Sequence, residues 1–312
     1  MHDVWIANFR PTDPPAQGQR SPPRPDRLSF QRAAVSVPPT HTVGQIEWPD
    51  GAPSGLQNFV TIEQQDIPSA ADFARRIARA DTGATGTTFL YVHGYNYTHG
   101  EAVYQMAQIA HDFDVPSPTV LFSWPSAGVP VGYLYDRDST LIARDQLEEV
   151  IVALTRQPGR RLEILGHSMG NLLIMETLRQ IEISGSVDIA DKIAALIMIS
   201  PDIDGELFYT QAARLRSLPR NTVILAARQD RALRVSALLT GRTNRLGSET
   251  DRAAVRDLPV AIVDTSQFAR DGRSHAVPLT SPSAIAILRR AQENPRVISG
   301  RSDRVIDLSS LR

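Results

Sequence analysis

The 312 residues of the sequence include no cysteine, which excludes thiol catalysis, disulfide bonds and thiolate metal sites. Acidic and basic residues nearly cancel, and the formal net charge is -1. This balance provides neither the basic surface that nucleic acid requires nor a polybasic segment for an anionic membrane, so we expect no nucleic-acid partner. Aromatic residues make up only 6%, so the core should consist mainly of aliphatic side chains.

Long hydrophobic runs are also missing. No stretch approaches the roughly 18 consecutive apolar residues of a transmembrane helix, so no transmembrane segment is predicted. The first residues lack the basic and apolar regions of a signal peptide. We expect a chain that is soluble as given, cytoplasmic if the sequence is complete and in the cell envelope if a leader was removed. The oligomeric state is not predicted.

Composition divides the chain into three parts. Residues 1–66 form an N-terminal extension with short strands expected at 4–8, 33–37 and 44–48, and with a proline-rich arm over 11–25. Residues 67–295 form the main domain, and residues 296–312 a C-terminal tail.

The main domain alternates short apolar strands with helices. Short strands without polar alternation are typical of a parallel sheet that is buried on both faces. The fold class is therefore α/β, a mostly parallel, doubly wound sheet with helices on both faces and a small β-rich extension. The expected strands are 87–92, 119–124, 161–165, 193–199, 222–227 and 260–263; the expected helices are 69–80, with Ser69 as N-cap, 100–113, 138–155, 169–181 and 282–292, with a shorter one before residue 222.

The segment Gly166-His167-Ser168-Met169-Gly170 matches the G-x-S-x-G pattern of a nucleophile elbow. A predicted strand precedes it and a predicted helix follows it, which is the context that the motif requires. A sharp turn between the two would expose the Ser168 hydroxyl at a helix N-terminus, where developing negative charge is favoured. The alternative is a glycine-bracketed turn with an ordinary capping serine.

A serine nucleophile needs an adjacent base, which in this fold follows the serine in the chain. His275 is the only one of the seven histidines beyond Ser168, so it is the predicted base. Asp230 follows the strand 222–227 and is the predicted acid that orients His275. Three other carboxylates that follow strands compete for this role: Asp202, Asp204 and Asp264.

The tetrahedral intermediate of acyl transfer needs two backbone N–H donors. Met169 follows the nucleophile and is one candidate. The loop after the strand 87–92 offers the other, and Gly94 there lets the backbone approach, so we assign it to Tyr95. His93 either shapes this hole or only holds the loop.

Further pocket candidates are His167, Trp124 and Asp202. Trp124 either lines the pocket or anchors the core. The sequence shows no metal-binding pattern and no phosphate-binding loop, so neither a metal nor a cofactor is expected.

The chain resembles a bacterial group of α/β hydrolases of unknown function in the esterase/lipase superfamily. The resemblance spans about residues 4–292, and it implies an α/β-hydrolase fold with Ser168 as nucleophile and Tyr95 and Met169 in the oxyanion hole. It rests on the segments 89–96, 122–128, 133–138, 166–171 and 200–204, of which Ser123-Trp124-Pro125-Ser126 and His167-Ser168-Met169-Gly170-Asn171 are the most specific.

We therefore predict a hydrolase that cleaves a small-molecule or lipid ester through Ser168, His275 and Asp230. One alternative is an acyltransferase that uses the same triad. The other is a binding protein that kept the fold and lost turnover.

Overall fold

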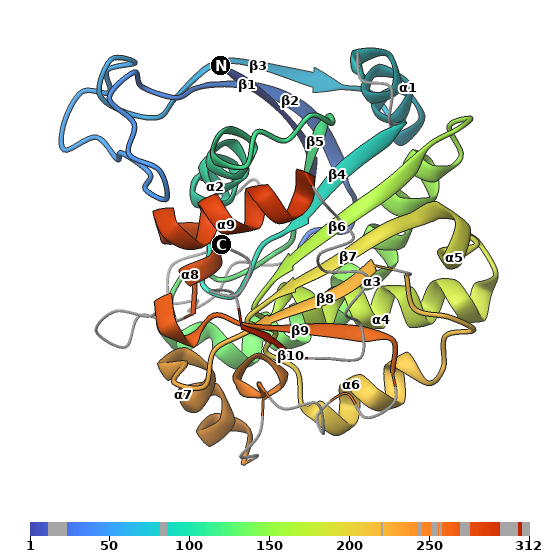
Figure 1. Ribbon diagram of the computed structural model, residues 1–312. Coiled ribbons are helices and arrows are strands. Elements are labelled where there is room, and N and C mark those ends of the chain that lie inside the picture. The colour runs from blue at the N-terminus through green and yellow to red at the C-terminus, as the bar shows by residue number, and fades with distance from the viewer. Residues whose placement is uncertain are drawn as a thin grey trace. The chain divides into compact units, whose positions relative to one another are not determined.

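The computed structural model describes residues 1–11, 24–81, 86–219, 221–241, 245–250, 255, 258–268, 275–293 and 305–307. The chain forms two compact units, Met1–Leu162 and Glu163–Arg312. Each unit combines strands and helices (Figure 1).

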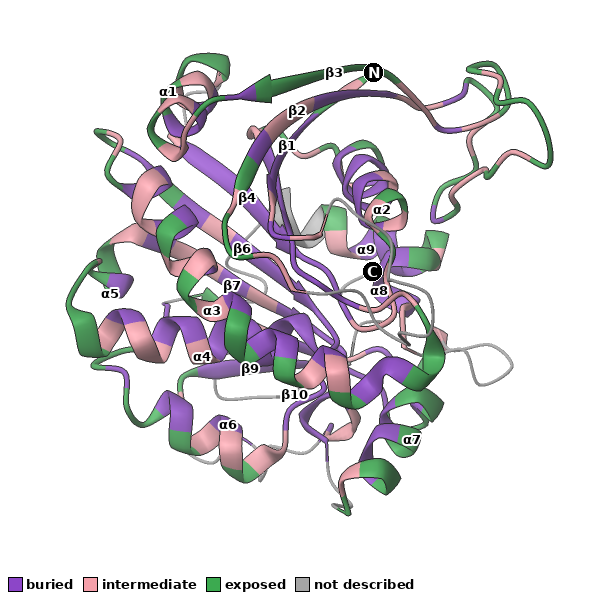
Figure 2. Ribbon diagram, turned by 180° about the vertical axis from the view of Figure 1, so that it is seen from behind, coloured by how far each residue is buried: buried purple, intermediate pink, exposed green. Residues whose placement is uncertain are grey.

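The strands of the first unit run in the order β4-β5-β1-β2-β3. Strand β1 pairs in parallel with β5 and antiparallel with β2, and β3 is antiparallel to β2. All residues of β4 and β5 are buried, as expected for strands covered on both faces, and β4 is purple in Figure 2. The strands are β1 (His2–Asn8), β2 (Ser29–Ser36), β3 (Val60–Ile67), β4 (Thr87–Val92) and β5 (Thr119–Ser123).

The helices of the first unit are α1 (Ala70–Ala80), α2 (His99–Asp112) and α3 (Tyr133–Thr155). Helix α1 starts at its predicted N-cap, where the Ser69 side chain accepts the N–H of Asp72. Helix α2 starts with a capping box between Thr98 and Glu101. Helix α2 packs on β1 and β5, and α1 packs on α3.

The second unit contains parallel strands in the order β10-β9-β8-β7-β6. The figures show α4 and α6 together on one face of β7, β8 and β9, and α8 and α9 on the other side (Figures 1 and 2). Strand β6 (Arg161–His167) crosses the boundary of the units. The other strands are β7 (Ile193–Ile199), β8 (Asn221–Ala226), β9 (Val260–Asp264) and β10 (Val305–Asp307). The helices are α4 (Gly170–Ser184), α5 (Ile189–Lys192), α6 (Gly205–Ala212), α7 (Arg231–Thr240), α8 (Val277–Thr280) and α9 (Pro282–Glu293).

The predicted α/β class, with a mostly parallel sheet and antiparallel strands near the N-terminus, is confirmed. One local prediction was wrong, and some elements were missed. Residues 44–48 form no strand: Gly44 has a φ of 85° and Trp48 lies exposed in a loop. The strand β3 was not predicted, because half of its eight side chains are polar and exposed on the edge of its sheet. Helix α7 was also not predicted.

Most of the proline-rich arm, the segment 271–274 before His275 and most of the C-terminal tail lie outside the described residues. None of the helices described combines the length and the apolar character needed to cross a bilayer. The division of the chain at residues 67 and 295 stays a prediction.

Candidate active site

Ser168 lies at the sharp turn between β6 and α4. Its φ of 51° places it in the left-handed region, which is strained for a residue with a side chain. Backbone hydrogen bonds hold this conformation: the Ser168 N–H donates to Ile199 O at 2.9 Å, and Ser168 O accepts the N–H groups of Asn171 and Asp202. Strain that is fixed in this way is typical of a nucleophile elbow.

Gly166 has no room for a side chain. An added Cβ would lie 2.2 Å from Asn171 Oδ1 and 2.6 Å from Ile174 Cδ1. Asn171 is fully buried, and its Nδ2 donates to Ser168 O and Ile199 O, both at 3.2 Å. The first glycine of the motif therefore makes room for an amide that ties the turn to the end of β7.

His275 and Asp230 form a hydrogen-bonded pair. His275 Nδ1 lies 2.8 Å from Asp230 Oδ2, and the Asp230 side chain is completely buried. The other carboxylate oxygen, Oδ1, accepts the N–H of Leu233 at 3.1 Å and caps α7. The carboxylate thus engages Nδ1 of the imidazole and not Nε2.

The pair lies next to the elbow. The ring of His275 packs against that of His167, the residue before Ser168, with 5.0 Å between the ring centroids. Burial, with a smaller contribution from the charge of His275, lowers the pKa of His167 to about 3. His167 is therefore neutral at physiological pH and adds no positive charge beside His275.

The competing carboxylates have other partners. Asp202 lies 3.3 Å from Arg245 Nε and accepts the hydroxyl of Ser236. Asp204 caps α6, where its Oδ1 accepts two backbone N–H groups. Asp264 accepts the N–H of Ser266 and lies 3.6 Å from Arg228. Of these four carboxylates, Asp230 is the one with a described hydrogen bond to His275.

In the first unit, His93 follows β4 and is fully buried. Its Nδ1 contacts Gly94 O at 2.8 Å, and its Nε2 accepts the N–H of Trp124 at 3.2 Å. The Trp124 indole has no exposed surface, donates to His93 O and stacks on the His93 ring, so it packs as a core anchor. Burial, together with the charge of Arg10, holds the pKa of His93 well below its usual range.

Arg10, which comes from the N-terminal extension, was not predicted. Its guanidinium donates to Ser123 Oγ at 2.9 Å, Ser126 O at 3.0 Å and Tyr97 O at 2.7 Å, and one of its nitrogens lies 3.1 Å from His93 Nε2. Arg10 thus joins the loops after β4 and β5. Its burial lowers its pKa to about 10. No motif marks a residue with this role.

Asp136, at the start of α3, was also missed. Its carboxylate accepts the N–H groups of Asn96 at 3.1 Å and Ala127 at 2.6 Å, and the hydroxyl of Ser126 at 2.5 Å. Burial raises the pKa of Asp136, against the effect of these hydrogen bonds. Asp136 therefore fixes the loop that holds Tyr95, whose hydroxyl donates to Pro130 O.

Residues 69–291 match the sequence model of a family described as "Alpha/beta hydrolase of unknown function (DUF900)". The chain belongs to this family. The α/β-hydrolase family assignment covers more than two thirds of the sequence, and it agrees with the parallel strands and intervening helices described above. The comparison with curated proteins finds no match.

Several solved structures are similar to this α/β hydrolase. The lin2722 gene product of Listeria innocua is 12% identical, with 71% of this chain and 97% of that chain covered and a TM-score of 0.43. Aspergillus fumigatus lipase B is 13% identical, with coverages of 79% and 62% and a TM-score of 0.38. The RedJ thioesterase from the prodiginine pathway of Streptomyces coelicolor is 18% identical, with coverages of 58% and 67% and a TM-score of 0.26.

The predicted site residues fall into two groups. In the second unit, His275 contacts Asp230 and packs against His167, the chain neighbour of Ser168, and Met169 lies in the same unit. His93, Gly94, Tyr95 and Trp124 belong to the first unit. The oxyanion hole that combines Tyr95 with Met169 stays a prediction.

Proposed function

We propose that this α/β hydrolase is a serine hydrolase that cleaves carboxylic esters through an acyl-enzyme. The observation that carries the proposal is the 2.8 Å contact between His275 Nδ1 and the buried Asp230, beside the strained Ser168 turn. A base held by a carboxylate and packed next to a serine elbow has the composition and order of a hydrolase triad.

In the proposed reaction, Ser168 Oγ attacks the ester carbonyl while His275 Nε2 takes its proton. Asp230 keeps the proton of His275 on Nδ1 and stabilises the imidazolium that forms. The N–H groups of Met169 and Tyr95 are the proposed donors to the oxyanion. His275 then protonates the leaving alkoxide, and water activated by the same histidine hydrolyses the acyl-enzyme.

The surface of α7 supports an ester with an apolar substituent. This helix starts directly after Asp230 and exposes three apolar side chains, Val235, Leu238 and Leu239, of which Leu238 is 82% exposed. Exposed apolar side chains that gather on one helix commonly mark a binding surface. A lipid or other long-chain acyl ester would use such a surface, and a short polar ester would not.

A fluorophosphonate probe tests the nucleophile directly, because it reacts only with an activated serine. We expect stoichiometric labelling of the native protein and complete loss of labelling in Ser168→Ala. Ser200→Ala is the matched control, since Ser200 also has a positive φ, 43°, and directly follows the neighbouring strand β7. Its labelling should remain.

A series of p-nitrophenyl esters of increasing chain length then tests the substrate class. We expect kcat/KM to increase from acetate towards long acyl chains. Transfer of the acyl group to an added alcohol in preference to water would indicate the acyltransferase. A folded native protein that neither reacts with the probe nor hydrolyses any ester would contradict the proposal and favour the binding protein.

A further inference from the structure

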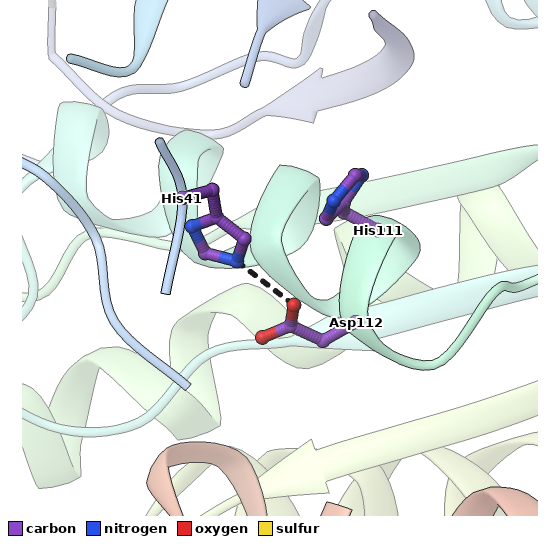
Figure 3. A group of neighbouring side chains, drawn as sticks. All are labelled: His41, His111 and Asp112. Atoms are coloured by element: carbon purple, nitrogen blue, oxygen red, sulfur yellow. Dashed lines mark hydrogen bonds and ion pairs between the residues drawn. The ribbon is translucent and has the colours of Figure 1, made fainter. Parts of the chain in front are cut away.

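A second group of ionisable side chains lies within the first unit, outside the residues assigned to catalysis. His41 comes from the loop between β2 and β3, and His111 and Asp112 form the last turn of α2. Figure 3 shows the three side chains facing one another. One ligand atom from each lies within 4.8 Å of the others.

The distances suit a small cation with little rearrangement. His41 Nε2 lies 2.8 Å from Asp112 Oδ1. Metal–ligand bonds of about 2.0–2.1 Å in a tetrahedral zinc site place the ligand atoms about 3.3 Å apart. The His41–Asp112 pair would open slightly, and His111 would move inward by roughly 1.5 Å. His111 is exposed, so its side chain has the freedom to do so.

The atoms that face away from the centre of the group already have partners. His41 Nδ1 lies 2.9 Å from Glu47 Oε2, which is the carboxylate–histidine arrangement found behind metal-bound imidazoles. Asp112 Oδ2 accepts the Gly44 N–H at 2.7 Å and the side-chain amide of Gln108. These contacts orient His41 Nε2 and Asp112 Oδ1 towards the same point.

Two further features concern charge and access. The carboxylates of Asp112 and Glu47 lie on either side of His41 and supply two negative charges, which a divalent cation would balance. The Asp112 side chain is fully buried and that of His41 is 4% exposed, whereas His111 opens to solvent and provides a path of entry. His2 Nε2 lies 3.1 Å from His111 Nδ1, an exposed contact that would yield when His111 moves inward.

We propose that His41, His111 and Asp112 bind a divalent transition-metal ion of the zinc class. Imidazole nitrogens with one carboxylate are the ligands that such ions prefer, whereas Mg²⁺ and Ca²⁺ favour all-oxygen sites. The ion replaces the proton between His41 Nε2 and Asp112 Oδ1. It joins the loop that carries His41 to the last turn of α2 and so stabilises the folded chain.

Calorimetric titration of the chelator-treated full chain with zinc chloride tests the proposal. We expect one saturable site, a higher melting temperature with zinc and no such response to magnesium. His111→Ala should weaken binding at least tenfold and abolish the zinc-dependent rise in melting temperature. Because His111 is exposed, this variant should fold normally without metal.

Two control variants decide where the ion binds. Asp114→Asn removes a nearby negative charge that is not part of the group, and asparagine tolerates the φ of 50° at this position. His275→Ala removes the histidine of the proposed catalytic pair. Both should bind zinc like the native chain. Absence of saturable binding, equal binding by His111→Ala, or loss of binding in His275→Ala would overturn the proposal.

Discussion

Replacing Asp230 with asparagine separates the two roles of this side chain. Asp230 Oδ1 caps α7 through the N–H of Leu233, and Oδ2 accepts the hydrogen bond of His275 Nδ1. Asparagine is as good an N-cap as aspartate, so its oxygen preserves the helix start. Its amide NH₂ then faces His275, and because this group is only a donor it cannot accept the hydrogen bond from Nδ1–H. We expect a folded protein whose serine is no longer activated.

The two effects differ greatly in size. The free energy of unfolding should change by less than about 1 kcal/mol, because the cap is retained. Loss of the carboxylate from a Ser-His-Asp triad lowers kcat by about 10⁴-fold, which corresponds to roughly 5 kcal/mol in the activation free energy. Asp230 has no exposed surface, so water has no access to replace the missing oxygen.

The rate of fluorophosphonate labelling reports activation of the serine, and urea unfolding reports stability. Asp204→Asn is the matched control, since Asp204 caps α6 in the same way as Asp230 caps α7. Its labelling rate should equal that of the native chain. Asp230→Ala should lose activity and also about 1 kcal/mol of stability, because alanine removes the cap.

A folded Asp230→Asn protein that reacts with the probe at the native rate would refute this reasoning. The carboxylate would then have no part in activating the serine, and the contact with His275 would be structural. Loss of labelling in Asp202→Asn, with native labelling in Asp230→Asn, would move the role of the acid to the carboxylate that pairs with Arg245.

Two further predictions concern stability. Gly166→Ala should lower the free energy of unfolding by about 3–5 kcal/mol in urea titrations, because the new methyl group overlaps Asn171 and breaks its two hydrogen bonds. Gly100→Ala is the control: nothing lies within 4 Å of the added methyl group, so this variant should be as stable as the native chain or more stable. Native stability of Gly166→Ala would contradict the steric argument. Folding lowers the pKa of His167 from 6.5 to about 3, so between these pH values the unfolded chain binds a proton that the folded chain does not. The free energy of unfolding therefore decreases as the pH is lowered from 6.5 to about 3. When the pH is lowered from 7.5 to 4.5, the free energy of unfolding of His167→Asn should therefore increase by about 2–3 kcal/mol relative to that of the native chain. A difference in unfolding free energy that stays constant over this pH range would rule out the linkage.

The parallel strands and their order of alternation with helices were predictable because their residues repeat a simple pattern. Strands such as β4 and β5 are buried on both faces, and this demands continuous apolar segments that are visible in the sequence. Edge strand β3 does not need an apolar segment, because many of its side chains are exposed to solvent, among them Glu63, Gln64 and Gln65. Its strand conformation follows from pairing with β2, which is a tertiary contact.

The residues proposed for the triad could be selected from the sequence because chemistry fixes their type and the fold fixes their order, and this selection stays a prediction. Arg10 and Asp136 have neither constraint: each is defined by the loops that it holds, and those loops come from distant parts of the chain. The group around His41 is similar. His41 and His111 are far apart in the sequence and match no known spacing of metal ligands, so no metal site was expected there.

The interior position of β1 has a consequence for synthesis. Strands β1 and β2 are both complete by Ser36, but β5, the parallel neighbour of β1, is complete only at Ser123. One edge of the nascent β1–β2 ribbon therefore remains open while more than eighty residues are translated. An open edge invites pairing with another chain, and pairing across such a separation is slow. Ribosome-bound chains that end between these two points should be the most prone to aggregate.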